Sequence, residues 1–182
     1  MSPRPKDSLM PVQTPLRPSP AVATEQPARY ALAAARLFLG WIFLWAFVDK
    51  LFGLGKPTEK GWLSGVSPSE GFLSHAEGPF KEIFHAMAGK VWADALFMFG
   101  LGGLGVALLL GICLRLAAIG GTVLLVMLWA ASLWPEANPF MDMHWIYAAT
   151  LIAAALADAG KTLGLGRFWE RLPVIRRHPL LR

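Results

Sequence analysis

The chain has 182 residues, of which 55% are hydrophobic and 16% are charged, and its mean hydropathy is +0.47. A soluble domain carries about a quarter charged residues, so this composition excludes an ordinary soluble globular protein and indicates an integral membrane protein. The net charge of +5 does not call for a nucleic-acid partner, because membrane proteins concentrate Lys and Arg in cytoplasmic segments. The single cysteine, Cys113, excludes an internal disulfide and CxxC chemistry.

Residues 1–29 are rich in proline and contain almost no clustered apolar residues. This composition is typical of a disordered tail. No apolar segment follows the early basic residues before Tyr30, so the stretch does not have the pattern of a signal peptide. We expect a disordered cytoplasmic tail over residues 1–29 and a transmembrane domain over residues 30–160.

The first apolar segment covers residues 30–52 and is long enough to cross a bilayer, which needs about 20 apolar residues. Arg36 lies inside this segment, and Asp49 and Lys50 lie at its other end. A charge inside the bilayer is costly and is a functional hypothesis by default. The question is therefore what Arg36 contacts at one end, and what Asp49 and Lys50 contact at the other.

Residues 53–90 form a long connection that carries helix signals. The run Ser67-Pro68-Ser69-Glu70 has the pattern of a helix N-cap, a proline at the first helical position and a capping-box glutamate. A second short helix is predicted after Pro79, because apolar residues then recur at helical spacing. They are Phe80, Ile83, Phe84, Met87 and Val91. We expect short amphipathic helices on the membrane surface, with a small soluble cap over the bundle as the alternative.

Three more spans are predicted over residues 91–113, 116–134 and 143–159, so the fold class is an all-α membrane four-helix bundle. Residues 161–182 are basic and contain Phe168 and Trp169, which predicts a cytoplasmic tail at the membrane interface. Lys and Arg concentrate in the two termini, so we expect both termini in the cytoplasm of a bacterial cell and a multi-pass plasma-membrane protein.

Two stripes of equal length predict how the first and last spans meet. The first comprises Arg36, Gly40, Phe43, Phe47 and Lys50, and the second His144, Ala148, Leu151, Ala155 and Asp158. In antiparallel spans these stripes pair Arg36 with Asp158 at the inner side, and Lys50 with His144 and Asp142 at the outer side. The inner pair is either a functional site or a buried ion pair that fixes helix register.

The outer side would then gather Asp49, Lys50, Asp94, Asp142 and His144. Acids, a base and an imidazole at the bilayer edge suit proton exchange with a bound redox ligand. The alternative is ordinary interfacial solvation with pairing at helix ends. Trp41, Trp45 and Asp49 share a neighbouring face, on which a quinone ring could stack; an aromatic belt or lipid packing is the alternative.

Two motifs carry no cofactor chemistry. Gly100 to Gly105 match GxGxxG, but the match lies inside a span with no preceding strand, so close helix packing explains it better than a nicotinamide nucleotide. The histidines offer no facing pair within the spans, and we expect neither haem nor a metal site.

Several motifs resemble the DoxX/DoxD family of bacterial four-helix membrane proteins. RLFLGWIFLWAFVDKLFG is similar to the family's first helix, and NPFMDMHWIYAATLIAAALADAGKTLGLGRFWERLP to its last helix and tail. GWLSG, GFL, GPFKEIF and GICLRLAAIGG resemble the DoxD-like branch, the large subunit of thiosulfate:quinone oxidoreductase. The resemblance implies electron transfer from a reduced sulfur donor to quinone, beside a small partner subunit.

We therefore hypothesise a membrane subunit of a quinone-linked oxidoreductase. The candidate catalytic residues are His144, Asp94, Asp49 and Lys50, and the candidate quinone-binding residues are Trp41, Trp45, Arg36 and Asp158. The expected partners are the lipid bilayer and a small subunit or a second copy of the chain, not nucleic acid. The alternative is a non-catalytic scaffold that recruits a partner; transport of a small solute fits less well, because the chain has no internal repeat.

Overall fold

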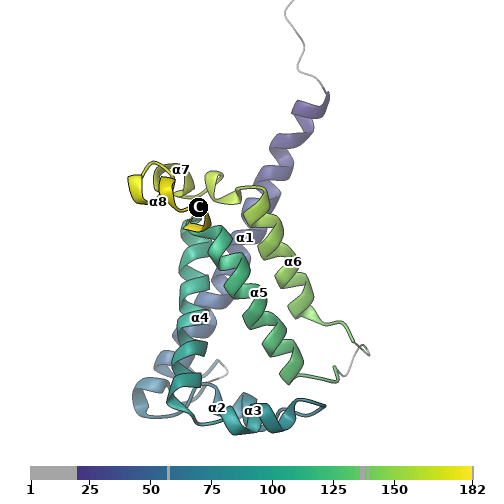
Figure 1. Cartoon of the computed structure of the whole chain (residues 1–182), viewed down its shortest axis with the longest axis vertical. Helices are drawn as coiled ribbons and strands as arrows, with labels where there is room; N and C mark the ends of the chain where they lie inside the picture. Colours follow the sequence, from purple (N-terminus) through teal and green to yellow (C-terminus); the bar gives the residue numbers. More distant parts are fainter. Residues whose placement is uncertain (1–19, 57, 136–137, 139, 182) are drawn as a thin grey trace, which may run out of the picture.

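In the computed structural model, the described residues are 20–56, 58–135, 138 and 140–181, and they contain helices but no strand. Four helices form the bundle: α1 (Pro20–Phe52), α4 (Val91–Leu110), α5 (Leu114–Ala131) and α6 (Met143–Leu156) (Figure 1). Figure 1 also shows short helices at both ends. We name the end that carries the C-terminal helices the tail end, and the opposite end the loop end. The predicted all-helical membrane fold is confirmed.

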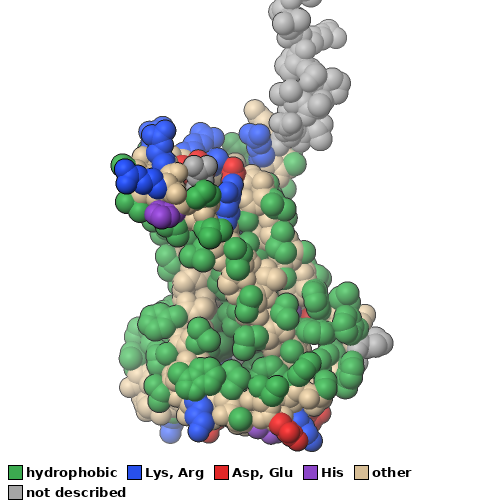
Figure 2. Space-filling view, in the orientation of Figure 1, with side chains coloured by type: hydrophobic (Ala, Val, Ile, Leu, Met, Phe, Trp, Pro, Cys, Tyr) green, Lys and Arg blue, Asp and Glu red, His purple; other side chains and the backbone are tan. Residues whose placement is uncertain are grey.

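Three segments are long and apolar enough to cross a membrane: Gln26–Phe52, Val91–Leu110 and Leu114–Ala131. The fourth predicted span is shorter, because α6 has 14 residues and so covers about 21 Å. A polar backbone turn ends it: Asp158 adopts a left-handed conformation (φ 48°) directly after the helix. Figure 2 shows a largely hydrophobic surface between the two charged ends of the molecule, as expected for a bilayer-facing bundle.

The prediction of a disordered stretch over residues 1–29 is wrong for its last ten residues. Helix α1 begins at Pro20 and continues through Pro27. Proline lacks a backbone N–H and therefore disfavours a helix interior. Here the helix is continuous with the long apolar segment that follows Pro27. The rest of the predicted tail, residues 1–19, lies outside the described residues.

Helix α1 packs closely against α4 through glycines. A Cβ atom on Gly105 would lie 2.7 Å from Leu44 Cα, and one on Gly102 would lie 3.0 Å from the Phe47 ring. On α1, a Cβ on Gly40 would lie 2.9 Å from Leu108 Cβ. Gly40 belongs to the stripe predicted to meet the last span, but it faces α4 instead, so this part of the prediction is wrong. The interpretation of the GxGxxG run as a helix-packing motif is confirmed for Gly102 and Gly105.

The predicted α6 stripe is buried, with Leu151 1% and Ala148 5% exposed. It packs on α5, where a Cβ on Gly121 would lie 2.6 Å from Leu151 Cδ1. The bundle core is a single cluster of side chains from all four helices, so each helix contributes one apolar face and leaves the other to lipid.

The connection between α1 and α4 folds as a lid over the loop end. It contains the short helices η1 (Trp62–Ser64), α2 (Glu70–Ser74) and α3 (Lys81–Met87), and Figure 1 shows α2 and α3 lying across the ends of α4 and α5. Leu73 and Phe84 are buried there against Ala93 and Ala131, whereas Phe80 and Ile83 are 43% and 61% exposed. One side of the predicted amphipathic stripe therefore closes the bundle and the other faces outward.

The C-terminal segment is folded rather than extended. It forms η2 (Ala159–Lys161), α7 (Gly166–Trp169), α8 (Pro173–Arg177) and η3 (Pro179–Leu181) at the tail end. Ile175 is 4% exposed, and Trp169 Nε1 donates to the Leu181 carbonyl at 2.6 Å. This packing holds the basic segment together at the tail end of the bundle.

Candidate functional site

Arg36 is fully buried at the tail end, and its guanidinium binds backbone carbonyls. Nη1 donates to the carbonyl oxygens of Leu108 and Leu109, the second at 3.3 Å. Nη2 donates to the carbonyl oxygens of Thr162 at 3.4 Å and Leu163 at 2.9 Å. The side chain therefore joins α1 to the end of α4 and to the segment after α6.

These hydrogen bonds satisfy backbone carbonyls at the C-terminal end of α4. The last four carbonyls of a helix have no partner within the helix, and an unpaired carbonyl is costly away from water. In α4 the Ala107 carbonyl accepts from the Gly111 amide at 2.9 Å, and the Leu110 carbonyl accepts from the Leu165 amide at 2.7 Å. Arg36 donates to the remaining two carbonyls, those of Leu108 and Leu109. Its positive charge also interacts favourably with the negative end of the helix dipole.

Glycines make this junction possible. Gly111 has φ +70°, and a Cβ atom there would lie 2.8 Å from Gly160 Cα and 3.1 Å from Arg36 Nη1. A Cβ on Gly164 would lie 2.6 Å from the Gly160 carbonyl oxygen, and one on Gly160 would collide with the Gly111 carbonyl. Larger residues would separate α4 from the C-terminal segment and leave Arg36 without its acceptors.

The predicted ion pair between Arg36 and Asp158 is wrong. Asp158 accepts a hydrogen bond from Lys161 at 2.8 Å, and Lys161 also pairs with Glu170 at 3.0 Å. The hydrogen bond to Asp158 raises the pKa of Lys161. Asp158 occupies a turn beyond α6, where it is partly exposed, so the carboxylate lies outside the apolar interior and Arg36 uses backbone acceptors instead.

The predicted outer cluster divides into separate local sites. Asp49 is 1% exposed and accepts from the backbone amides of Lys56 and Thr58, both at 3.0 Å. It therefore closes the turn that follows α1. Lys50 Nζ lies 5.9 Å from the centroid of the Phe97 ring and forms no ion pair with Asp142 or His144 within the described part of the chain, so its predicted contact is wrong.

Asp142 and His144 form their own pair at the start of α6. His144 Nδ1 lies 2.6 Å from Asp142 Oδ2, and the His144 amide donates to Asp142 Oδ1 at 3.0 Å. Asp142 is thus the N-cap of α6. The described residues contain no group of three His, Cys, Asp or Glu side chains that could hold a metal ion.

Asp94 is 5% exposed and holds the lid to α4. Its Oδ1 accepts from the hydroxyls of Ser67 and Ser69, both at 2.6 Å, and from the Ser69 amide at 3.2 Å. Ser67 in turn accepts from the Glu70 amide at 3.1 Å. The predicted N-cap at Ser67 is wrong, because α2 begins at Glu70 with Ser69 as its N-cap, and Ser67 closes the turn before the helix. Each outer carboxylate therefore organises a turn near its own helix end.

Trp41 and Trp45 lie on the exposed side of α1. Their ring centroids are 6.0 Å apart with an interplanar angle of 34°, and they are 57% and 36% exposed. Both side chains are exposed in the described structure, so a ring stacked there would face lipid on its other side.

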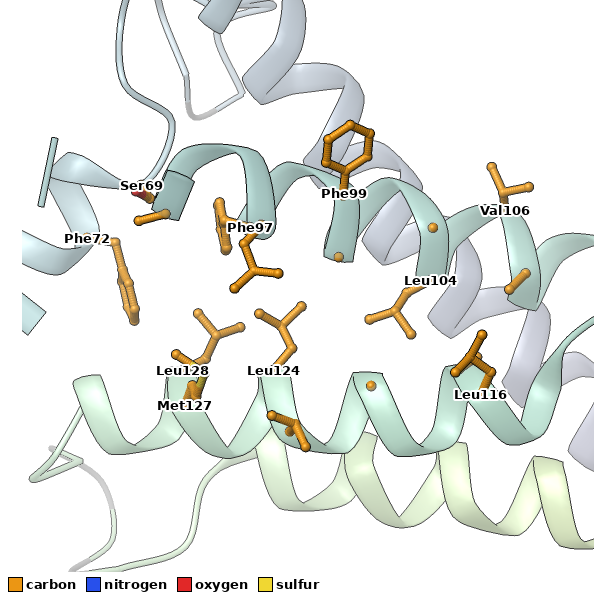
Figure 3. A pocket seen from close by; sticks show the side chains of 18 of the residues that line it. Ser69, Phe72, Phe97, Phe99, Leu104, Val106, Leu116, Leu124, Met127 and Leu128 are labelled. Atoms are coloured by element: carbon orange, nitrogen blue, oxygen red, sulfur yellow. The ribbon is translucent and has the colours of Figure 1, made fainter. Parts of the chain in front are cut away.

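A long groove lies between α4 and α5, and the sequence did not predict it. Its volume is about 720 Å³. In Figure 1, α4 and α5 diverge from their hairpin towards the lid, and Figure 3 shows side chains of both helices pointing into the space between them. Along α4 the groove runs from Ala93 to Ala107, which is about 21 Å at 1.5 Å per residue.

The groove is apolar apart from its two ends. Of the described side chains that line it, only Ser69 and Cys113 are polar. Ser69 lies at the lid (Figure 3), where its hydroxyl donates to Asp94. Cys113 lies at the hairpin, where burial raises the pKa of its thiol. Several lining residues are also exposed on the rim, including Phe99 at 76% and Val123 at 57%, so the groove opens sideways to the lipid.

Glycines create the space. Gly100, Gly103 and Gly120 line the groove, and a Cβ on Gly103 or Gly120 would meet nothing within 4 Å. The signal was present in the sequence as four glycines within Gly100–Gly105. The periodicity does not say that two of them face α1 while the other two face a cavity.

Comparison with known proteins identifies a family but no individual relative. Neither the curated proteins nor the solved structures give a significant match. The model of the DoxX family matches residues 31–134, which is more than half of the chain and extends from α1 past the end of α5. With three apolar helices of membrane-spanning length, the chain therefore belongs to the DoxX family of membrane proteins.

Proposed function

We propose that this DoxX family protein is the membrane subunit of a quinone-linked oxidoreductase, and that the α4–α5 groove is its quinone site. The observation that supports the proposal is an apolar groove of about 720 Å³ that opens to lipid and ends at a hydroxyl bonded to a buried carboxylate. Ligand pockets of about 300–1,000 Å³ with few polar groups are typical of small-molecule sites.

The shape of the groove suits an isoprenoid quinone. The rim residues Phe99 and Val123 face the bilayer, so a lipid-soluble molecule could enter from the side. The tail would lie along Gly103 and Gly120, where no side chain fills the space. The ring would lie at the lid between Phe72 and Phe97 (Figure 3), with Ser69 within reach of a quinone oxygen.

Quinone reduction at this site would need a group that delivers protons to the quinone oxygens. Reduction of a quinone to a quinol takes two electrons and two protons. Asp94 is the candidate proton carrier, because it is buried and its Oδ1 lies 2.6 Å from the Ser69 hydroxyl; a proton on Asp94 would reach the quinone oxygen through Ser69. Asp49 and His144 lie in separate local sites, and a direct proton role for them has less support.

The electron donor follows from the resemblance to the DoxD-like branch, and we propose a reduced sulfur compound such as thiosulfate. Two thiosulfates that join through sulfur give tetrathionate and release the two electrons that the quinone takes up. Lys50 is the candidate cation for an anionic donor, since its Nζ lies 5.9 Å from the centroid of Phe97, a groove-lining ring. A small partner subunit is proposed as the carrier between donor and quinone.

The orientation belongs to the same proposal. Basic residues gather at the tail end (Figure 2), which favours the tail end in the cytoplasm of a bacterial cell and the lid on the other side of the plasma membrane.

The test fills the groove without disturbing the bundle. Gly103→Leu and Gly120→Leu place a side chain in open space, whereas Ala153→Leu adds the same side chain to an exposed position of α6. The full chain is purified into nanodiscs that contain a long-chain quinone, and bound quinone per chain is measured after extraction. We expect both groove variants to lose most of the bound quinone and Ala153→Leu to keep it.

A second measurement separates binding from catalysis. Membranes that contain the chain and its native partners are supplied with thiosulfate and a quinone analogue, and quinol formation is followed. Asp94→Asn should retain quinone but form quinol more slowly. Equal quinone content in the groove variants and the wild type would reject the groove. Loss of quinone in Trp41→Leu and Trp45→Leu alone would place the ring on the exposed face of α1 instead.

A non-catalytic scaffold is the second candidate, because Asp49 and Asp142 are engaged in local turns and Asp94 is bonded to the lid. A stoichiometric partner that co-purifies with the chain while the lipid extract contains no quinone would favour it.

A further inference from the structure

A second cavity lies at the tail end, away from the quinone groove. It is a cleft of about 570 Å³ between the beginning of α1 and the segment that follows α6. Four basic side chains line it, Arg29, Lys161, Arg167 and Arg171, together with the aromatic rings of Tyr30 and Phe168. No acidic side chain is among its described lining residues. The quinone proposal uses none of these groups.

The basic charge of the cleft is only partly neutralised. Lys161 pairs with Asp158 and Glu170. The Arg171 guanidinium lies 5.6 Å from the centroid of the Phe168 ring, a contact that orients it without cancelling its charge. For Arg167 the structure gives no ion pair with any described carboxylate. The cleft therefore has an excess of positive charge that an anionic group could compensate.

The position of the cleft is that of a lipid headgroup. It lies where the first apolar span begins, at Gln26 to Tyr30. Tyr30, Phe168 and Leu163 are 56%, 66% and 58% exposed around it. Aromatic side chains are enriched at the headgroup level of membranes, and exposed apolar residues beside a charged cleft can contact acyl chains. Figure 2 shows that Lys and Arg gather at this end of the molecule.

We propose that this cleft binds the phosphodiester headgroup of an anionic phospholipid from the adjoining leaflet. Guanidinium groups bind phosphate oxygens in a bidentate manner, and Arg167 and Arg171 would supply them. The bound lipid would connect α1 to the C-terminal segment. The Arg36 junction lies next to the cleft, because the Thr162 and Leu163 carbonyls that accept from Arg36 belong to cleft-lining residues.

The test compares lipid retention by charge-matched variants of the full chain. The protein is reconstituted in vesicles of phosphatidylcholine with a minor share of phosphatidylglycerol, and lipids retained after release into detergent are measured by native mass spectrometry. The cleft variant is Arg167→Gln with Arg171→Gln. The control, Arg115→Gln with Arg177→Gln, removes two charges at the same end from residues that do not line the cleft.

We expect phosphatidylglycerol retention to fall at least about tenfold in the cleft variant, because it loses the charge-assisted hydrogen bonds to the phosphate, and to stay within about two-fold in the control, whose arginines lie outside the cleft. Arg167→Lys with Arg171→Lys keeps the charge and should retain most of the binding, which separates loss of the site from loss of folding. Retention of the quinone in the cleft variant would show that the quinone groove is intact.

Three results would overturn the proposal. The first is an equal loss in the cleft variant and the control, since the effect would then be that of general charge. The second is equal retention of phosphatidylcholine and phosphatidylglycerol by the wild type. The third is displacement of the lipid by millimolar inorganic phosphate, which would assign the cleft to a free phosphate compound instead of a membrane lipid.

Discussion

Helix α4 meets its two neighbours in different ways. On the α1 side, Gly105 brings the backbones together until no Cβ would fit, and Gly102 makes room for the Phe47 ring. Arg36 closes the end of that interface. On the α5 side, Gly103 faces an open groove in which a Cβ would meet nothing within 4 Å. Glycine therefore has opposite effects on one helix. Where a partner backbone approaches, it gives close packing, and where the partner helix diverges, it leaves space for a ligand.

The largest expected effect is the loss of the Arg36 junction, which tests the closed side of the comparison. Arg36→Met should lower the free energy of unfolding by about 3–5 kcal/mol, because it leaves the carbonyls of Leu108 and Leu163 without their donor inside the protein. Arg36→Lys should recover only part of this loss, since one ammonium cannot reproduce the planar two-sided contact. Unfolding by denaturant in detergent micelles measures this change in the free energy of unfolding.

The control for that measurement is Arg115→Gln, whose guanidinium makes one long contact, 3.4 Å, to the Pro179 carbonyl. We expect it to change the free energy of unfolding by less than about 0.5 kcal/mol. If Arg36→Met were as stable as the control, Arg36 would not be the group that fastens α4 to α1.

The next largest effect is the difference in stability between two Gly→Ala variants, one on each side of α4. Gly105→Ala adds a methyl group that would lie 2.7 Å from Leu44 Cα, so it should destabilise the bundle by about 1–3 kcal/mol. Gly103→Ala adds the same methyl group to open space and should be neutral or slightly stabilising, because alanine favours a helix. Thermal unfolding of the two variants measures the difference, and equal melting temperatures would contradict the assignment of a closed and an open side.

The smallest effect is on the reactivity of Cys113, the single thiol of the chain, which lines the open groove. Burial raises the pKa of this thiol, so little reactive thiolate is present at neutral pH, and alkylation should become about tenfold faster for each pH unit towards that pKa. A long-chain quinone analogue should slow the reaction by covering the thiol. The rate of labelling by a maleimide, followed by mass spectrometry, tests both statements.

The control for the labelling experiment is a short quinone without an isoprenoid tail, which should bind at the lid and leave Cys113 accessible at the hairpin. A rate that neither quinone changes would mean that the groove does not hold the tail.

Much of the fold could be predicted from the sequence because the bilayer imposes strong rules. Runs of apolar residues predict α4 and α5 within a few positions, and the run Ser67 to Glu70 predicts a helix start in the lid, although the N-cap is Ser69. The boundaries were less accurate: α4 ends at Leu110 rather than Cys113, because Gly111 adopts a left-handed conformation, and α1 begins at Pro20 rather than Tyr30.

The candidate site was predicted less well. The sequence placed Asp94 in a polar cluster at the outer end of the spans, but periodicity could not reveal that its partners are Ser67 and Ser69 from a distant turn. The cavity beside it was missed, because its walls are ordinary apolar residues. Its existence depends on the angle between α4 and α5, which no local pattern encodes.

By itself, the sequence determined that this protein is a helical membrane bundle with one arginine inside its first span, because apolar length and an isolated charge have the same meaning in any bilayer. Only the tertiary structure decided what satisfies that arginine. A buried guanidinium needs acceptors, and both a carboxylate and the free carbonyls of a helix end can supply them. The choice between them depended on where α4 ends, and on the glycines that let the C-terminal segment reach it.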